Sequence, residues 1–383
     1  MLEENLCWNQ VDDPFGLRYS HSGGNFGGND AEGDEANSHR VNTRVSNFAS
    51  NVNAAVVVNS QIGNGMPSVG AMLNDAYFAA WSHLVVEGDS GDNVFVLRTN
   101  DFDTDHMDLL VDGELVCTMH KDFVQALTLR RLGGDDTFQI DTLPANTHLT
   151  LEGGTGSDAF ALDLNGLGGI AGAVTVLGGV GSDAVVNAEV GGDRLTIDDL
   201  AGGPGTDFYA VAGSVFDWTG YANVFNFGQL ERLELLASHH DNDIALSGAT
   251  GLSRLTVRGG GGNDDFALDA ITGGVLIALH GEGNADTFNV SGVAGGGVDM
   301  WGDPDGLPFG WADRLNLGNG NTDAVTAAMS FHARLGADSI VVNDKAAAVN
   351  RRVDIDNDSI NFDGPGYVTF DGVESITHHG GTR

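Results

Sequence analysis

LTVRGGGGNDDFALDA (255–270) decides the fold of this chain, and LTLEGGTGSDAFALDL (149–164) repeats its pattern. In both segments, a stretch of alternating apolar and polar residues leads into a loop of glycine and aspartate, and a second alternating stretch follows. Strict alternation is typical of β-strands that turn one face toward a core. Glycine permits the left-handed backbone that such tight loops need. Each segment therefore predicts a strand, a short loop and a second strand.

The glycine-aspartate loop recurs along the chain. Four segments match G-G-x-G-x-D with an apolar residue two positions later: GGTGSDAF (153–160), GGVGSDAV (178–185), GGPGTDFY (202–209) and GGGGNDDF (259–266). Degenerate copies are GDSGDNVF (88–95), GGDDTF (133–138), HHDNDI (239–244) and GEGNADTF (281–288), followed by the shorter GGDRL (191–195), WADRL (311–315), GADSI (336–340) and DNDSI (356–360).

The period of these loops indicates stacked repeats. The apolar residues that follow the aspartates are mostly 22 to 27 positions apart, and no helical pattern lies between them. Such a period is typical of repeat architectures in which each unit contacts only its neighbours. We therefore expect an all-β, right-handed parallel β-solenoid, of the β-helix or β-roll kind, with about 22–25 residues per coil.

The chain divides into three parts by composition. Residues 1–40 form an acidic, glycine-rich segment that is typical of a flexible linker, and residues 41–84 form an N-terminal flank that could cap the first repeat. Residues 85–383 carry the repeats. FGQLERLELLASHHDND (227–243) returns as FDGVESITHHGG (370–381), with Glu231 and Glu374 in matching places. The second copy stops where its loop should begin, so we expect the parent protein to continue.

The charge balance favours a cation as partner. There are 54 acidic and 17 basic residues, which give a formal net charge of −37. Nucleic acids and anionic membranes are polyanions, so we expect neither as a partner.

No apolar stretch is long enough for a transmembrane helix, and no secretory leader is visible. Two cysteines are too few for a disulfide framework.

Stacking in register would place Asp158, Asp183 and Asp207 in one column, about 4.8 Å apart. Each adjacent carboxylate pair would repel by about 1 kcal/mol even in bulk water, and by more at a protein surface. A divalent cation between coils would turn this repulsion into attraction. Calcium takes six to eight carboxylate and carbonyl oxygens with tolerant geometry, whereas magnesium demands a stricter octahedron and zinc prefers His or Cys.

GGTGSDAFA (153–161), GGVGSDAVV (178–186), GGPGTDFYA (202–210) and GGGGNDDFA (259–267) resemble the haemolysin-type, or RTX, nonapeptide G-G-x-G-x-D-x-U-x. The resemblance implies a calcium-bound β-roll in a secreted protein, with motif aspartates and loop carbonyls as ligands. The best ligand candidates are the loop residues Asp158, Asp183, Asp207, Asp264, Gly153, Gly156, Gly178, Gly181, Gly202, Gly205, Gly259 and Gly262, and the degenerate loops add Asp92, Asp136, Asp243 and Asp286. RTX motifs run back to back, whereas this chain has one motif per longer coil, a length closer to that of pectate-lyase-like β-helices.

These observations predict a non-enzymatic, calcium-binding structural or adhesion segment of a larger extracellular or cell-surface protein, whose folding is coupled to calcium. No G-x-S-x-G, H-E-x-x-H or G-x-x-x-x-G-K-[ST] signature occurs. Two alternatives stay open. One is a β-helix that binds or cleaves polysaccharide, for which aromatic and basic residues along one face would be the sign. The other is a calcium-independent solenoid adapted to salt.

Overall fold

The computed structural model describes strands within residues 9–59 and, with side chains, residues 82–130, 133–164, 169–180, 192–202, 207–248, 251–304, 310–346 and 352–380. The chain forms two compact units. Unit 1 comprises Met1–Val86 and Val94–Thr128, and unit 2 comprises Glu87–Asn93 and Leu129–Arg383. β5 (His83–Glu87) and β9 (Ala126–Arg130) each contain residues of both units. The described residues contain no helix of the length and apolarity needed to cross a membrane.

Unit 1 consists of antiparallel strands. β1 (Asn9–Asp13), β2 (Gly16–Gly24), β3 (Val41–Phe48) and β4 (Asn53–Asn59) pair in this order. β6 (Val94–Thr99), β7 (His106–Val111) and β8 (Glu114–His120) form a second antiparallel set. Strands β1 and β2 therefore lie inside the segment expected to be a flexible linker, and residues 25–40 lie outside the described residues.

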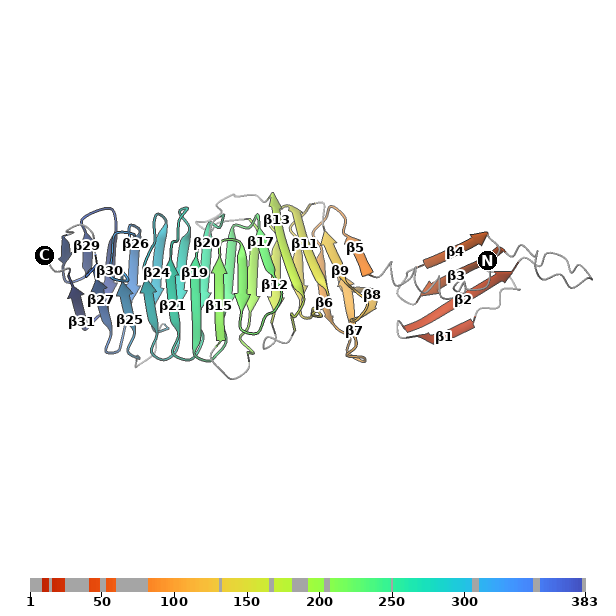
Figure 1. Ribbon diagram of the computed structural model, residues 1–383, viewed down its shortest axis with the longest axis horizontal. Helices are drawn as coiled ribbons and strands as arrows, with labels where there is room; N and C mark the ends of the chain where they lie inside the picture. The colour runs from red at the N-terminus through yellow and green to blue at the C-terminus, as the bar shows by residue number, and fades with distance from the viewer. Residues whose placement is uncertain are drawn as a thin grey trace, which may run out of the picture. The chain divides into compact units, whose positions relative to one another are not determined.

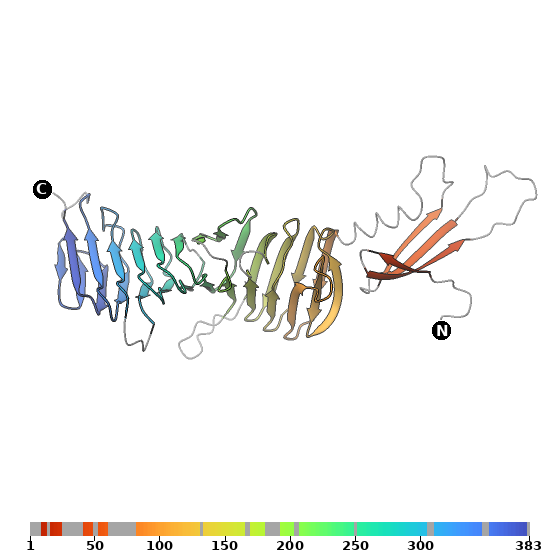
Figure 2. The same cartoon turned by 90° about the horizontal axis from the view of Figure 1, so that it is seen from below.

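Unit 2 is built from two sheets, in which most neighbouring strands are parallel (Figures 1 and 2). Sheet one has the order β10 (Thr137–Ile140), β12 (Ala159–Asp163), β14 (Arg194–Asp198), β18 (Arg232–Leu236), β20 (Arg254–Arg258), β22 (Leu276–His280), β24 (Gly297–Trp301), β26 (Ala328–His332), β30 (Tyr367–Asp371), β29 (Ser359–Phe362) and β28 (Val353–Ile355).

Sheet two has the order β11 (His148–Thr155), β13 (Ala173–Val180), β17 (Phe225–Gly228), β16 (Val215–Trp218), β15 (Asp207–Ala212), β19 (Asn242–Ser247), β21 (Asp265–Asp269), β23 (Thr287–Val290), β25 (Arg314–Leu317), β27 (Ser339–Asn343) and β31 (Ser375–His379). Successive strands alternate between the sheets, except that β15–β17 stay in sheet two and β28–β30 stay in sheet one as antiparallel excursions. The expected all-β fold of mostly parallel strands is confirmed.

The core lies between the two sheets because alternate residues of each strand point inward. β12 and β20 show the regular alternation of buried and half-exposed residues that their sequences predict. Equivalent aromatic side chains stack from one repeat to the next: the ring centroids of Phe138 and Phe160 are 4.9 Å apart, and so are those of Phe266 and Phe288. This distance matches the spacing of neighbouring strands, about 4.8 Å, so the ladder of rings follows directly from in-register pairing.

The expectation that Asp158 and Asp207 stand in one column is wrong, and Asp183, the third residue expected there, lies outside the described residues. Phe138 and Phe160 pair in sheet one, whereas Tyr209, Ile244 and Phe266 lie in sheet two. The aspartates before these residues therefore fall on two different turns of the repeat. Asp193 and Asp207 are 14 positions apart, which is about half of one repeat. This half-repeat step moves the motif from the turn that enters sheet one to the turn that enters sheet two.

Candidate functional site

The motif aspartates form two ladders of buried carboxyl groups. Each aspartate directly precedes a strand, and its Oδ1 accepts a hydrogen bond from the main-chain N–H of the equivalent residue in the previous repeat. In the first ladder, the bonds run from Asp136 N to Asp158 Oδ1 (2.9 Å), from Asp158 N to Asp193 Oδ1 (2.8 Å) and from Asp193 N to Glu231 Oε2 (2.6 Å). These residues precede the strands of sheet one.

The second ladder has the same construction and precedes the strands of sheet two. Its bonds run from Asn242 N to Asp264 Oδ1 (2.8 Å), Asp264 N to Asp286 Oδ1 (2.9 Å), Asp286 N to Asp313 Oδ1 (2.8 Å), Asp313 N to Asp338 Oδ1 (2.7 Å) and Asp338 N to Glu374 Oε2 (2.7 Å). Both ladders end on the glutamates that the sequence placed in matching positions. The longer glutamate side chain thus provides the last acceptor of each ladder.

In some of the loops, the residue before the ladder position makes a similar bond in the opposite direction. Asp92 Oδ1 accepts from Asp135 N (2.9 Å), and Asp241 Oδ1 accepts from Asn263 N (2.8 Å). These outer side chains are exposed, so water can solvate their charge. The loops are therefore joined to their neighbours in both directions by carboxylate-to-backbone hydrogen bonds, and the ladder aspartates are the buried half of this network.

In five of the ladder aspartates, the second carboxyl oxygen is buried without a hydrogen-bond partner. This holds for Oδ2 of Asp158, Asp264, Asp286, Asp313 and Asp338, each of which is at most 1% exposed. A buried carboxylate oxygen without a partner is costly, because nothing replaces the water that it loses. The ladders therefore contain repeated acceptor sites for a proton or a cation.

Burial raises the pKa of these carboxyls well above the ordinary value of 3.8. The pKa is about 7 for Asp158, Asp264 and Asp313, about 9 for Asp286 and about 6 for Asp338. Desolvation is the main cause in each case, the hydrogen bond from the previous repeat opposes it, and neighbouring carboxylates add to it. In the absence of a cation, these groups therefore retain protons at a pH where exposed aspartates are ionised.

The first glycine of the motif makes room for the buried oxygen. A Cβ added to Gly153, Gly259 or Gly281 would overlap the Oδ2 of the aspartate five positions later. The glycine at the fourth position of the motif has a different role. Gly156 and Gly262 have φ values of 130° and 112°, in the left-handed region that favours glycine. The motif thus needs its first glycine for space and its later glycines for backbone conformation.

The space beside the first motif glycine also holds a main-chain carbonyl oxygen close to the carboxyl group. The Cβ position of Gly153 overlaps both Asp158 Oδ2 and the carbonyl oxygen of Gly178 in the next repeat, and that of Gly178 overlaps Asp193 Oδ2 and the carbonyl oxygen of Gln229. A carboxylate oxygen and a main-chain carbonyl oxygen therefore converge beside each of these glycines. This pair of donors belongs to the set that calcium prefers.

Several predicted site residues lie where the sequence placed them, and others do not. Asp136, Asp158, Asp264 and Asp286 are in the ladders. Asp207 is buried at the start of β15, away from the Asp158 column. Gly202 lies close to Ser238, so that an added Cβ would come within 2.7 Å of the serine Cβ. Residues 181, 183 and 205, which include the expected Asp183, Gly181 and Gly205, lie outside the described residues.

Two expected residues are one position from the ladder. Asp243 is exposed, and Asn242 occupies the position two residues before the inward Ile244. Asp92 likewise belongs to the outer set, and Asn93 holds the motif position before Phe95. In both loops the ladder residue is not the predicted aspartate, because the alternation of the following strand, and not the residue type, fixes the position. The same rule identifies the ladder residues that the sequence analysis did not select: Asp193, Asp313 and Asp338.

The comparisons with known proteins add no family. No protein-family model and no curated protein matches the chain. Within the described ranges, no cluster of three or more His, Cys, Asp or Glu side chains forms a metal-binding group.

Proposed function

We propose that this chain is a calcium-stabilised structural segment of an extracellular or cell-surface protein, with the fold of a right-handed parallel β-solenoid and with no catalytic role. The observation that carries the proposal is the row of buried Oδ2 atoms without a hydrogen-bond partner in Asp264, Asp286, Asp313 and Asp338. The alternation of strands between two parallel sheets supports the solenoid.

The buried carboxyl groups need a neutralising partner. Successive ladder residues precede neighbouring strands, which lie about 4.8 Å apart. Two carboxylates at this distance repel by about 1 kcal/mol in water and several-fold more near a protein surface. A proton removes the charge of one group, whereas a divalent cation neutralises two. In a chain with a net charge of −37, a cation also lowers the repulsion over the whole molecule.

The residues present fit calcium better than the other common divalent ions. The oxygens that converge beside Gly153 and Gly178 are one carboxylate oxygen and one main-chain carbonyl oxygen in each case. Calcium accepts such mixed oxygen donors in irregular geometry. Asp158, Asp264 and Asp286, with loop carbonyls, would hold it. The ion would supply charge neutralisation between neighbouring repeats, and the ladder hydrogen bonds would keep each carboxylate oriented toward it.

Calcium binding of this kind links folding to location. Extracellular modules bind calcium with dissociation constants of about 10⁻⁴ to 10⁻³ M. Binding to the folded chain alone adds RT ln(1 + [L]/Kd) to stability, so several weak sites together add several kcal/mol outside a cell and almost nothing at cytosolic calcium. A chain of this design would stay loose before export and become rigid outside.

The test is a calcium titration of thermal unfolding, followed by circular dichroism, in the whole chain and two variants. Asp286→Asn keeps an Oδ1 acceptor for the ladder but replaces the second oxygen by an N–H donor. Asn242 shows that the turn tolerates this, because its Nδ2 donates to the carbonyls of Ser238 and Gly259 (both 3.0 Å). Asp243→Asn, at an exposed site, is the matched control.

We expect the melting temperature of the wild type and of Asp243→Asn to rise with calcium, and to rise less with magnesium at equal ionic strength. Asp286→Asn should respond less to calcium. Equal melting temperatures in chelator and in calcium would refute the proposal, and so would an unchanged calcium response in Asp286→Asn.

A further inference from the structure

The outward face of sheet one carries arginines in neighbouring strands. Arg194 in β14, Arg232 in β18 and Arg254 in β20 are directly paired in register. Arg258 lies at the other end of β20, and Arg334 follows β26. We call these five arginines the basic face. Like charges opposite one another on adjacent strands are destabilising, so this arrangement opposes stacking in a chain that has few basic residues.

A row of aromatic side chains continues from Arg258. The register runs from Arg258 to His280, Trp301 and His332 on successive strands. The ring centroids of His280 and Trp301 are 4.6 Å apart at 7°, and those of Trp301 and His332 are 5.4 Å apart at 21°. Both faces of the indole are therefore covered by imidazole rings, and Nδ1 of His332 lies 2.7 Å from Asp371 Oδ2.

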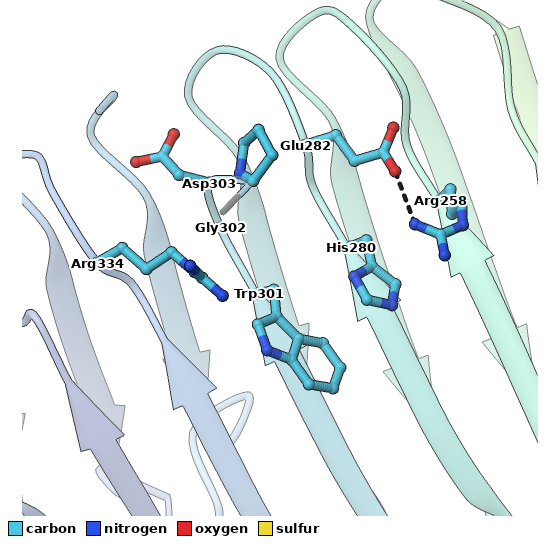
Figure 3. A pocket seen from close by; sticks show the side chains of 8 residues that line it. Arg258, His280, Glu282, Trp301, Gly302, Asp303 and Arg334 are labelled. Atoms are coloured by element: carbon cyan, nitrogen blue, oxygen red, sulfur yellow. Dashed lines mark hydrogen bonds and ion pairs between the residues drawn. The ribbon is translucent and has the colours of Figure 1, made fainter. Parts of the chain in front are cut away.

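A pocket of about 230 Å³ lies beside this row. Its lining includes Arg258, His280, Glu282, Trp301, Asp303 and Arg334, and Figure 3 shows the two arginines on opposite sides of the histidine and the indole. Arg258 is held by Glu282 (Nη1 to Oε1, 2.9 Å).

The backbone of the pocket is itself strained. Arg334 and Glu282 have φ values of 71° and 75°, in the left-handed region that is unfavourable for residues other than glycine. Strain of this kind is concentrated at functional sites.

Within the basic face, Arg258 is paired with Glu234 and Glu282 (3.8 and 2.9 Å), whereas Arg194, Arg232 and Arg254 lie opposite one another on neighbouring strands. Burial, and after it the charges of Arg258, Arg254 and Arg334, lower the pKa of His280 to about 4. The imidazole is thus neutral at physiological pH, and the other ionisable groups of the pocket are the two arginines and the side chains of Glu282 and Asp303. At physiological ionic strength, charges act over about 8 Å, and the register of β14, β18 and β20 places Arg194, Arg232 and Arg254 on directly neighbouring strands about 4.8 Å apart.

We propose that the basic face binds an acidic polysaccharide through the carboxylates of its uronate residues. Guanidinium groups pair with carboxylates through two parallel hydrogen bonds. Arg194, Arg232 and Arg254 follow the stacking direction and span two strand spacings, about 10 Å, so an extended polymer can contact them in succession. Single-stranded nucleic acid fits this face less well, because it is recognised by bases stacked on exposed aromatic faces, and those of Trp301 are covered.

The test is isothermal titration of the whole chain, at one fixed free calcium concentration, with a hexamer of galacturonate. A neutral glucose hexamer and a single-stranded oligonucleotide are the comparison ligands. Arg254→Gln removes an exposed member of the basic face, and Arg314→Gln removes an exposed arginine of β25 in sheet two as the matched control. Circular dichroism checks that each variant is folded.

We expect the galacturonate hexamer to bind and the glucose hexamer not to bind. Arg254→Gln should weaken binding about tenfold or more, since a hydrogen bond to a charged group contributes about 1.5–3 kcal/mol, and Arg314→Gln should have no effect. No binding of the uronate hexamer, equal effects of the two variants, or tighter binding of the oligonucleotide would each overturn the proposal. None of these outcomes depends on the calcium response, so the two proposals stand or fall separately.

Discussion

Replacing Gly281 by alanine tests whether the first motif glycine exists to make room for the buried carboxyl group. A Cβ at this position would overlap Asp286 Oδ2 and would lie 2.6 Å from its Cγ and 2.9 Å from its Cβ. All three atoms are in one buried side chain that cannot move without losing its bond to Asp264 N. Gly283 in the same loop is the matched control, because the nearest atom to its added Cβ is a carbonyl oxygen 3.5 Å away.

The magnitude follows from two costs. Overpacking a buried site costs about 1–3 kcal/mol, and loss of the Asp264 N–H to Asp286 bond leaves a buried donor without its acceptor, for about 1–3 kcal/mol more. Alanine returns about 0.4–1 kcal/mol by restricting the unfolded chain. We therefore expect Gly281→Ala to lower the free energy of unfolding by about 1–5 kcal/mol, whereas Gly283→Ala should be neutral or slightly stabilising.

Urea unfolding followed by circular dichroism measures both variants, and a double-mutant cycle with Asp286→Gly isolates the interaction. Removing the aspartate side chain removes the three atoms nearest to the new Cβ, so Gly281→Ala should cost much less in that background. If Gly281→Ala costs no more than Gly283→Ala, or if the cycle is additive, the carboxyl group does not occupy the space beside the glycine and our account of the motif fails.

Three further predictions concern pH, the end of a ladder and the core. The unfolding free energy of the calcium-free chain should be highest below pH 4 and fall toward pH 7, because the Asp264 carboxyl has a pKa of 3.8 unfolded and about 7 folded. Each such group contributes up to about 1.4 kcal/mol per pH unit. Denaturant titrations that show the unfolding free energy rising between pH 4 and pH 7 would contradict this prediction. Glu374→Ala removes the last acceptor of the second ladder and should lower the unfolding free energy by about 1–2 kcal/mol. The control Glu234→Ala, at a half-exposed ion pair, should lower it by about 0–1 kcal/mol. Equal losses in the two variants would argue against a stabilising role of the ladder. Phe266→Ala in the core should cost about 3–5 kcal/mol, and Phe208→Ala, whose side chain is 43% exposed, should cost far less in the same unfolding assay.

The sequence predicted the repeats and the strands well because both are local. Apolar residues two positions after the motif aspartate, such as Phe160 and Phe266, lie inward as expected, since alternation along a strand fixes which side chains face the core. Residue type favours Asp243 as the ladder residue, whereas the alternation of β19 places Asn242 there. Counting back from the inward Ile244 would have identified Asn242, and the same count identifies Asp193 and Asp313.

The sequence by itself determined that this chain is all-β, that its repeats have a fixed internal order, and that most of its loops combine glycine with an acidic residue. Those properties depend on alternation and on backbone conformation within a few residues. Only the tertiary structure decided that the aspartates form two ladders, because the half-repeat step between Asp193 and Asp207 depends on how the variable loops return. It also decided that the arginines share one outward face, since residues 22 to 38 positions apart, such as Arg194, Arg232 and Arg254, become neighbours only when strands pair in register.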